Sequence, residues 1–396
     1  MTIDLDRARS DTPGTASVAH FDNAGAALMP VPVIDAVNEH FAREIALGGY
    51  RAAEEAGAQI EAVYASLAHL LNCAADEIAV VENATRAWDM AFYAFRFAPG
   101  DRILVAMAEY ASNYIALLQV ARRDGALIEV IPDDAHGQLC TRALEAAIDD
   151  RVKLIAVTHA PTNGGLINPA AAIGRIARAA GVPFLLDACQ SVGQVPIDVA
   201  AIGCDMLSGT GRKYLRGPRG TGFLYVHRDL AQRLEPPFLD LHAATWVAAD
   251  RYEIRPDARR FENWECNVAA KLGLGAAVDY ALGWGLAAIR RRVSALAEDL
   301  RARLAAIPGV GVHDLGVERS GIVTFTVDGH DVGAIKAALR ACEINVSTST
   351  VFSTRLDMTA RGVGPLVRAS AHYYNDEGEI ERLVDAVSAI ARGKAS

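Results

Sequence analysis

Short apolar runs alternate with amphipathic stretches along the chain from about Glu77 to Val226. Apolar runs of this length are typical of strands that are buried on both faces, as in parallel sheets. Seven strands are predicted, at Ile78–Val81, Ile103–Ala106, Leu127–Ile131, Leu154–Thr158, Pro183–Leu186, Met206–Ser208 and Gly222–Val226. Helices are predicted between them, at Ala84–Phe97, Ser112–Asp124, Ala143–Ile148 and Ala170–Ala180. This alternation predicts a doubly wound α/β fold with a mainly parallel seven-stranded sheet.

The pattern changes after a less regular, proline-containing stretch at about Glu235–Asp257. A helix near Val268–Leu282 leads into a long charged helix at Leu286–Ala306. The remaining predicted elements are strands Gly321–Val327, Ile344–Val346 and Leu366–Ala371, and helices Val332–Ala341 and Glu377–Arg392. We therefore expect a large domain over residues 18–270 and a smaller α+β domain over residues 271–396. Residues 1–17 are expected to pack on the small domain or to be partly disordered.

Composition and charge narrow the range of partners. The net charge is -9 and the pI is about 5.6, so no global basic field attracts nucleic acid or anionic membranes, and neither is expected as a partner. The polar N-terminus lacks the apolar region of a secretory signal, and no run approaches the roughly 18 to 20 apolar residues of a membrane span. We expect a cytoplasmic protein. The six cysteines lack CxxC spacing, which predicts no metal site and no disulfide framework, and most are expected to be small buried hydrophobes.

Lys213 is the first candidate for chemistry. Only five lysines occur in the chain, and Lys213 alone lies in a glycine-rich loop between two predicted core strands, within Ser208–Gly222. A lysine there can form a Schiff base with a carbonyl group if its surroundings lower its pKa enough to supply free amine. A solvated loop lysine is the alternative interpretation.

Asp187 is the second candidate. It follows the apolar strand Pro183–Leu186, so its carboxylate is expected at the carboxyl edge of the sheet, where open α/β sheets bind ligands. A carboxylate there can keep the nitrogen of a pyridine ring protonated, which makes that ring an electron sink. The alternative role, the N-cap of a helix, is common for an aspartate at a strand end.

These motifs together resemble the class V aminotransferase and cysteine desulfurase family. The resemblance is carried by Leu186–Ser191, Thr210–Lys213 and Gly217–Gly222, and it extends in the family's order from Phe21–Ala27 to Tyr374-Asn375. It implies a fold-type I enzyme dependent on pyridoxal 5′-phosphate (PLP), with the cofactor in the large domain. It also implies a homodimer whose active sites lie at the subunit interface.

The resemblance implies roles for individual residues. Lys213 would carry the cofactor as a Schiff base and remove the substrate's α-proton as general base. Asp187 would contact the pyridine nitrogen, and Gln190 would donate a hydrogen bond to the phenolic oxygen. Thr210 and Arg212 would contact the phosphate.

Three other segments match the family's cofactor-binding segments. Ala84 and Thr85 match its phosphate turn and begin a predicted helix, whose free N–H groups suit an anion, although a simple N-cap would use the same hydroxyl. Tyr110 occupies the position of the ring-stacking histidine, where it keeps the stacking but loses easy proton transfer near neutral pH. Thr162 and Asn163 compete for the position of an asparagine near the cofactor oxygen, and we favour Asn163.

The substrate contacts implied by the resemblance centre on Arg368. It matches the family's arginine that holds the substrate α-carboxylate by a bidentate pair, although an isolated arginine is more often part of a surface ion pair. Asn23, Tyr50 and Arg51 are further candidates for contact with the substrate. For Arg51 a surface role is at least as compatible with the sequence.

Two stretches depart from the family pattern. The stretch Asn345–Thr354 corresponds to the loop that carries a nucleophilic cysteine in desulfurases, but it contains no cysteine, and Phe352 fills that position. A phenyl ring cannot accept sulfur, so a persulfide-forming desulfurase is not expected. In Arg260–Asn267, Glu265 stands where relatives place a threonine that reaches the neighbouring subunit's phosphate. Asn263, Trp264 or Asn267 would line the neighbouring site instead, unless this stretch is only the entry to a helix.

The sequence therefore predicts a PLP enzyme that acts on an amino acid through an external aldimine and an α-carbanion. A carbon–sulfur lyase that works by β-elimination is the favoured activity, and transamination, epimerisation or racemisation are the alternatives. A non-catalytic protein with this fold is disfavoured because Lys213, Asp187 and Arg368 are all present.

Overall fold

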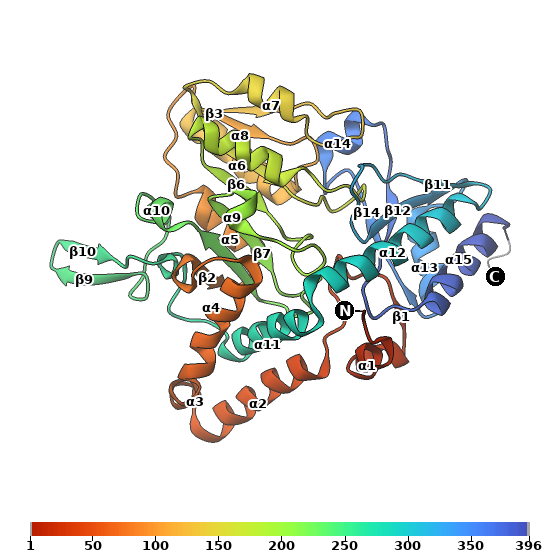
Figure 1. Cartoon of the computed structure of the whole chain (residues 1–396), viewed down its shortest axis with the longest axis horizontal. Coiled ribbons are helices and arrows are strands. Elements are labelled where there is room, and N and C mark those ends of the chain that lie inside the picture. The colour runs from red at the N-terminus through yellow and green to blue at the C-terminus, as the bar shows by residue number, and fades with distance from the viewer. Residues whose placement is uncertain (1, 394–396) are drawn as a thin grey trace.

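A seven-stranded sheet forms the centre of the computed structural model, which describes residues 2–393 (Figure 1). Its strands lie in the order β2-β8-β7-β6-β5-β3-β4, and β8 alone runs antiparallel to its neighbours. Their bounds are β2 Ile78–Val81, β3 Arg102–Val105, β4 Leu127–Val130, β5 Val152–Thr158, β6 Phe184–Asp187, β7 Met206–Thr210 and β8 Gly222–Val226. All seven predicted strands are present, with ends shifted by at most two residues. The predicted α/β fold is confirmed.

Both faces of this sheet are covered, which explains the uninterrupted apolar runs. On β6, for example, Leu185 belongs to one hydrophobic core and Leu186 to the other. Helices α5 (Ala84–Phe92) and α6 (Ala111–Asp124) cover one face, and the opposite face packs against a second set of helices. That set comprises α4 (Gly57–Leu71), α7 (Thr141–Ala147), α8 (Ala170–Ala180) and α11 (Val268–Trp284).

Helix α5 is five residues shorter than predicted, because it ends at Phe92 instead of Phe97. Five residues along a helix correspond to a rotation of about 140°, which would direct these two side chains away from each other. In the structure the Phe92 and Phe97 rings lie 5.7 Å apart, within one aromatic cluster. The helix therefore ends early and the chain turns back.

Further elements were not predicted, among them the buried helix α4 and two protruding features. The helices α2 (Val31–Leu47) and α3 (Gly49–Glu55) lead into α4 and extend from the body of the molecule (Figure 1). The stretch that was predicted to be less regular contains a protruding hairpin of β9 (Ala244–Ala248) and β10 (Arg251–Ile254). Most of its side chains are exposed, so no buried run marks these strands in the sequence.

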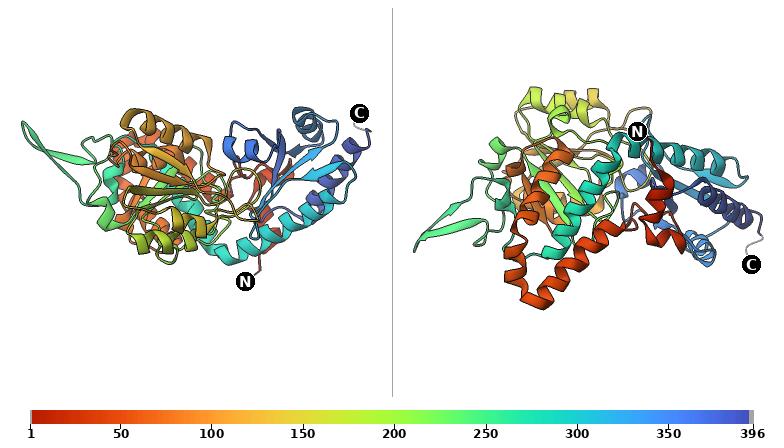
Figure 2. Two further views of the ribbon diagram at one scale, coloured as in Figure 1. Left: turned by 90° about the horizontal axis from the view of Figure 1, so that it is seen from above. Right: turned by 60° about the horizontal axis from the view of Figure 1, so that its bottom comes forward.

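A second sheet lies in the C-terminal part of the chain, in the smaller lobe of Figure 2. Its antiparallel strands lie in the order β11 (Val310–Val312), β12 (Ile322–Val327), β15 (Leu366–Ser370) and β14 (Ser347–Ser349). Helices α12 (Leu286–Ala305), α13 (Val332–Ala341) and α15 (Glu377–Ala391) pack on it through one hydrophobic core. The predicted strand Ile344–Val346 corresponds to β13 (Ile344–Asn345), which pairs in parallel with β1 (Ala19–His20), whereas β14, which joins the sheet, was not predicted.

The N-terminal segment contacts this C-terminal lobe. Arg9, on α1 (Leu5–Ser10), forms ion pairs of 3.0 Å with both Asp376 and Glu379 at the start of α15. The predicted boundary between residues 270 and 271 falls within α11 and stays a prediction, and residues 1 and 394–396 of the predicted segments lie outside the described part. No single helix among residues 2–393 is long and apolar enough to cross a membrane, and α11 with α12 meets that criterion only as a pair bent by 81°.

Candidate active site

A cavity of about 520 Å³ lies at the carboxyl edge of the large sheet, around Lys213. Three strands end at its wall: β5 at Thr158, β6 at Asp187 and β7 at Thr210. Thr158 and Asp187 are register partners on adjacent strands, so their side chains come from neighbouring positions on this edge. The predicted residues Ala84, Thr85, Tyr110, Asp187, Gln190, Thr210, Arg212 and Lys213 all line this cavity.

Lys213 is buried, with 9% of its surface exposed. Its Nζ atom donates a hydrogen bond of 3.3 Å to the Sγ atom of Cys189, and it makes no ion pair with a carboxylate among residues 2–393. Burial lowers the pKa of the Lys213 ammonium below its usual value, and the charge of Asp187 only partly opposes this shift. The environment therefore favours the free amine.

Asp187 is held by two donors. Its Oδ2 atom accepts a 2.8 Å hydrogen bond from Nδ2 of Asn113, and its Oδ1 atom accepts a 2.9 Å hydrogen bond from the backbone N–H of Cys189. Burial raises the pKa of the Asp187 carboxyl, and both hydrogen bonds act against that shift. No role was predicted for Asn113, although it lies only three residues after Tyr110 in the sequence.

Glu109 is a second buried carboxyl group beside the cavity, and the sequence analysis gave it no role. Its Oε1 atom accepts a 2.8 Å hydrogen bond from the backbone N–H of Thr158, and Oε2 accepts a 2.7 Å hydrogen bond from the Thr158 hydroxyl. Burial raises the pKa of Glu109 to about 8. The next residue, Tyr110, precedes α6 and lines the cavity with 37% of its surface exposed.

One end of the cavity is built for an anion. Helix α5 begins there at Ala84 and Thr85, and the capping Asn83 side chain accepts only the N–H of the third helical residue. The N–H groups of the first turn have no partner within the helix, and the helix dipole adds partial positive charge. The guanidinium groups of Arg212 and Arg219 line the same cavity and make no hydrogen bond or ion pair with residues 2–393.

Gly222 fixes the position of this helix. It is the first residue of β8, and a Cβ atom added there would lie only 2.4 Å from the carbonyl carbon of Asn83. The backbone of β8 and the start of α5 are therefore in direct contact. Beside it, the Thr210 hydroxyl donates a 3.2 Å hydrogen bond to the carbonyl of Thr221.

Of the two competing loop residues, Thr162 lines the cavity and Asn163 does not. The Oδ1 atom of Asn163 accepts a 2.9 Å hydrogen bond from the Thr354 hydroxyl, and its buried Nδ2 atom has no partner among the described residues. The geometry thus favours Thr162 over the predicted Asn163. Gln190 donates from Nε2 to the carbonyl of Ala24 at 3.1 Å, and its buried Oε1 atom lacks a partner within the described chain.

Arg368 adjoins the cavity through Thr162. It lies on β15 with 7% of its surface exposed, and its Nη1 atom donates a 2.6 Å hydrogen bond to the Thr162 hydroxyl. Its Nη2 atom lies 3.3 Å from Oδ1 of Asp22, and Nε has no partner in the described part of the chain. The guanidinium thus keeps donor capacity beside the cavity.

The other three candidates for substrate contact do not line the cavity of their own chain. Asn23 is fully buried, and its Nδ2 atom donates to the carbonyls of His20 at 3.0 Å and Ser370 at 2.7 Å. Its Oδ1 atom accepts the hydroxyl of Tyr374, so its polar atoms are all occupied. Tyr50 and Arg51 lie exposed on α3, and the Arg51 side chain pairs with Glu55.

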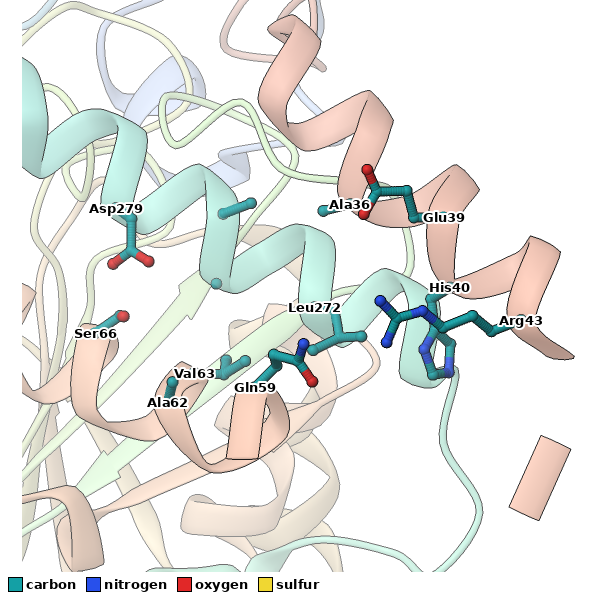
Figure 3. A pocket seen from close by; sticks show the side chains of 12 residues that line it. Ala36, Glu39, His40, Arg43, Gln59, Ala62, Val63, Ser66, Leu272 and Asp279 are labelled. Atoms are coloured by element: carbon teal, nitrogen blue, oxygen red, sulfur yellow. The ribbon is translucent and has the colours of Figure 1, made fainter. Parts of the chain in front are cut away.

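A separate cavity of about 260 Å³ lies between α2, α4 and α11 (Figure 3). Its labelled side chains include Glu39, His40 and Arg43 from α2, and Asp279 from α11. It contains none of the predicted site residues. Within residues 2–393, no group of three or more His, Cys, Asp or Glu side chains is arranged to hold a metal ion.

Comparison with known proteins gives the same family along the whole chain. The family described as aminotransferase class-V matches residues 19–383. A probable cysteine desulfurase of Methanothermobacter thermautotrophicus is 31% identical over 389 residues, covering 97% of each chain. The cysteine desulfurase of Dickeya dadantii is 30% identical over 405 residues, covering 98% of this chain and 97% of its own. The solved apo structure of the cysteine desulfurase from Thermococcus onnurineus NA1 has a TM-score of 0.92 at 28% identity and covers 99% of each chain. This chain belongs to the class V aminotransferase family.

Proposed function

We propose that this protein is a PLP-dependent carbon–sulfur lyase that acts on an amino-acid substrate. The observation that carries the proposal is the arrangement of one cavity. It is lined by a buried lysine that has no carboxylate partner among residues 2–393, by a buried aspartate and by the anion-binding start of a helix. The relatives at 30% identity or more are named cysteine desulfurases, which act on a carbon–sulfur bond as their name states.

The donor set fits PLP. N–H groups at the start of α5 that have no partner within the helix suit the phosphate, and so does the Arg212 guanidinium, which is unpaired within residues 2–393. Gln190 lines the cavity, but its Nε2 donor is bonded to the carbonyl of Ala24, so the predicted hydrogen bond to the phenolic oxygen stays a prediction. When bound, the cofactor supplies an aldehyde for covalent attachment and a pyridinium ring that withdraws electrons from the substrate's α-carbon.

Lys213 and Asp187 have complementary roles in this proposal. The lowered pKa of Lys213 supplies a free amine, which can attach the cofactor and later remove the α-proton. Asp187 would accept a hydrogen bond from the protonated ring nitrogen of the cofactor. The hydrogen bonds from Asn113 and the Cys189 backbone keep its carboxylate oriented. The positive ring nitrogen would in turn offset the burial that raises the Asp187 pKa.

Arg368 is proposed to bind the substrate's α-carboxylate. It is the buried cation that reaches the cavity wall from the smaller lobe, and its Nε atom is unpaired within residues 2–393. Asp22 occupies only one of its nitrogen atoms, at 3.3 Å. A substrate carboxylate would complete the charge balance of this guanidinium.

The loop Asn345–Thr354 supports β-elimination over persulfide formation. The carbonyl of Ser353 accepts the N–H of Ala111, the residue after Tyr110, so the loop lies against the cavity wall. This loop contains no cysteine, and Phe352 is 73% exposed on it. Without a thiol acceptor at this position, sulfur would leave with the eliminated fragment.

The homodimer is part of the same proposal. The α2–α3 extension and the β9–β10 hairpin protrude from the body (Figure 1), and they expose Tyr50, Trp246 and Tyr252. Exposed aromatic side chains on protruding elements are typical of association surfaces. Tyr50 and Arg51 would then reach the partner's site, since they do not line their own. A cytoplasmic location stays a prediction from the sequence.

The experiment is a substrate panel with the purified enzyme and PLP. We expect cysteine, cystine, cysteine conjugates or their sulfoxides to yield pyruvate and ammonia without an added keto acid. An Asp187→Ala variant should lose this turnover, and the exposed Asp229→Ala variant should keep it. Consumption of a supplied keto acid, with formation of a keto acid that keeps the substrate's sulfur and without pyruvate, would instead indicate transamination and would overturn the lyase assignment.

A further inference from the structure

Cys189 is the only cysteine among residues 2–393 that lines the cavity around Lys213. It follows β6, two residues after Asp187, and its backbone N–H is fixed by a 2.9 Å hydrogen bond to the Asp187 carboxylate. Its sulfur lies 3.3 Å from Nζ of Lys213 and accepts a hydrogen bond from that atom. Cys189 thus contacts both the buried aspartate, through its backbone N–H, and the buried lysine, through its sulfur.

We propose that Cys189 is a positioning residue for Lys213, whose amine it holds by one N–H so that the nitrogen lone pair remains free for an aldehyde in the cavity. The inference rests on the proposed role of Lys213 as the attachment site. Attachment joins the Lys213 nitrogen to the aldehyde carbon and releases one water, with no net oxidation or reduction. Its rate therefore depends on a free lone pair that is directed at the carbon.

A sulfur acceptor suits this task better than a carboxylate. A carboxylate at 3.3 Å would stabilise the ammonium form, which has no lone pair, whereas a thiol sulfur is a weak acceptor without full charge. Burial raises the pKa of the Cys189 thiol, so the thiol stays neutral. Burial lowers the pKa of Lys213 at the same time, which favours the free amine beside this neutral thiol.

Three other charged groups also act on Lys213, and they act in opposite directions. Arg212 and Arg368 are positive and favour the free amine, whereas Asp187 is negative and opposes it. Arg212 follows β7, Arg368 lies on β15 and Asp187 ends β6, so these groups act from three different elements. Cys189 is the group in hydrogen-bond contact with Nζ, and it therefore orients the amine.

The test uses the full chain freed of cofactor, as wild type and as Cys189→Ala, Cys189→Ser and Lys213→Ala. Cys342→Ala serves as the control, because that thiol is exposed. PLP is added, and attachment is followed by absorbance and by peptide mapping after borohydride reduction. Loss of one weak hydrogen bond should slow attachment in Cys189→Ala by about 3- to 10-fold. Cys189→Ser, which restores an acceptor, should recover most of the rate.

A second readout needs no cofactor. The pH dependence of Lys213 acetylation by acetic anhydride, read by peptide mass spectrometry, reports the fraction of free amine. A hydrogen-bond acceptor at Nζ stabilises the ammonium form to some degree even when the acceptor is uncharged, so removal of the Cys189 sulfur should shift the midpoint to lower pH. Wild-type rate and midpoint in Cys189→Ala would overturn the proposal, and so would a serine variant as slow as the alanine variant. If Lys213 takes up no PLP at all, the proposed function fails, while the acetylation midpoints still decide the role of Cys189.

Discussion

Two lysines of this protein are buried to the same degree but have very different partners. Lys213 is 9% exposed and Lys271 is 8% exposed. Lys271 donates to the Tyr64 hydroxyl, lies 4.5 Å from the centre of the Tyr64 ring and is 3.7 Å from the Glu262 carboxylate. Lys213 has a single weak sulfur acceptor and lines an open cavity. Burial alone therefore does not distinguish a reactive lysine from a structural one. The number of hydrogen-bond and ion-pair partners of the amine does.

Two buried carboxyl groups, Glu262 near Lys271 and Glu109 next to the cavity wall, differ in how far their surroundings stabilise the charged form. For Glu262, burial would raise the pKa, but hydrogen bonds from His242 and Tyr64 and the charge of Lys271 outweigh it, and the pKa is lowered. For Glu109, the Thr158 hydrogen bonds offset burial only in part, and the pKa is raised to about 8. The charge of Glu262 is compensated by groups of its own chain, namely Tyr64, His242 and Lys271. The cavity leaves charges uncompensated, which is the condition for binding charged ligands.

The largest expected effect separates the two lysines directly. Lys213→Ala should abolish covalent attachment of PLP and lower turnover by a factor on the order of 10³ or more. Lys271→Met should keep the attachment, because its amine is already bonded within the protein. Borohydride reduction with peptide mapping measures both. A label on Lys271, or full turnover in Lys213→Ala, would contradict the comparison.

The next effect concerns stability. Lys271→Met leaves the Glu262 carboxylate with less compensation in the interior, and the free energy of unfolding should fall by about 3 to 5 kcal/mol. Adding Glu262→Gln should restore part of that loss, because the uncompensated charge is removed. Urea unfolding measures both variants, with Lys153→Met at an exposed position as the control. A double variant as unstable as the single one would show that Lys271 acts through packing and not through charge.

The smallest expected effect is the pH dependence caused by Glu109. Its folded pKa of about 8 lies above the ordinary value of 4.5, so the folded protein keeps a proton that the unfolded chain releases. Its contribution to stability is therefore fully present below about pH 4.5 and is lost as pH rises through 8, at about 1.4 kcal/mol per pH unit between these values. Glu109→Gln should lack this slope in unfolding experiments between pH 5 and 9, whereas the exposed Glu145→Gln should keep it. Parallel slopes in wild type and Glu109→Gln would remove Glu109 as the cause.

The large sheet could be predicted because its strands are buried on both faces, which leaves uninterrupted apolar runs in the sequence. Exposed or protruding elements carry no such mark, so α2, α3 and the β9–β10 hairpin were not predicted. Lys213 and Asp187 could be predicted because each stands alone beside a strand end in a recognisable motif. Long-range contacts could not: Asn113 meets Asp187 across 74 residues of sequence.

Neighbouring loop residues were also beyond prediction. Whether Thr162 or Asn163 lines the cavity depends on backbone angles in a loop that continues with two positive-φ glycines, Gly164 and Gly165. No alternation rule of the kind that holds in strands applies there. No role was predicted for Cys189, because its contact with Lys213, which lies in the loop after β7, appears only in the folded structure.

The contact between Gly222 and Asn83 has a consequence for redesigning the enzyme. Because no side chain fits between β8 and the start of α5, the loop that ends at Gly222 and carries Lys213 is tied to the anion-binding turn. Attempts to change substrate preference should therefore leave this position fixed and vary wall residues such as Tyr110 and Thr162. In most variants of a library that randomises Gly222, the new side chain would clash with Asn83 and displace the start of α5 from β8.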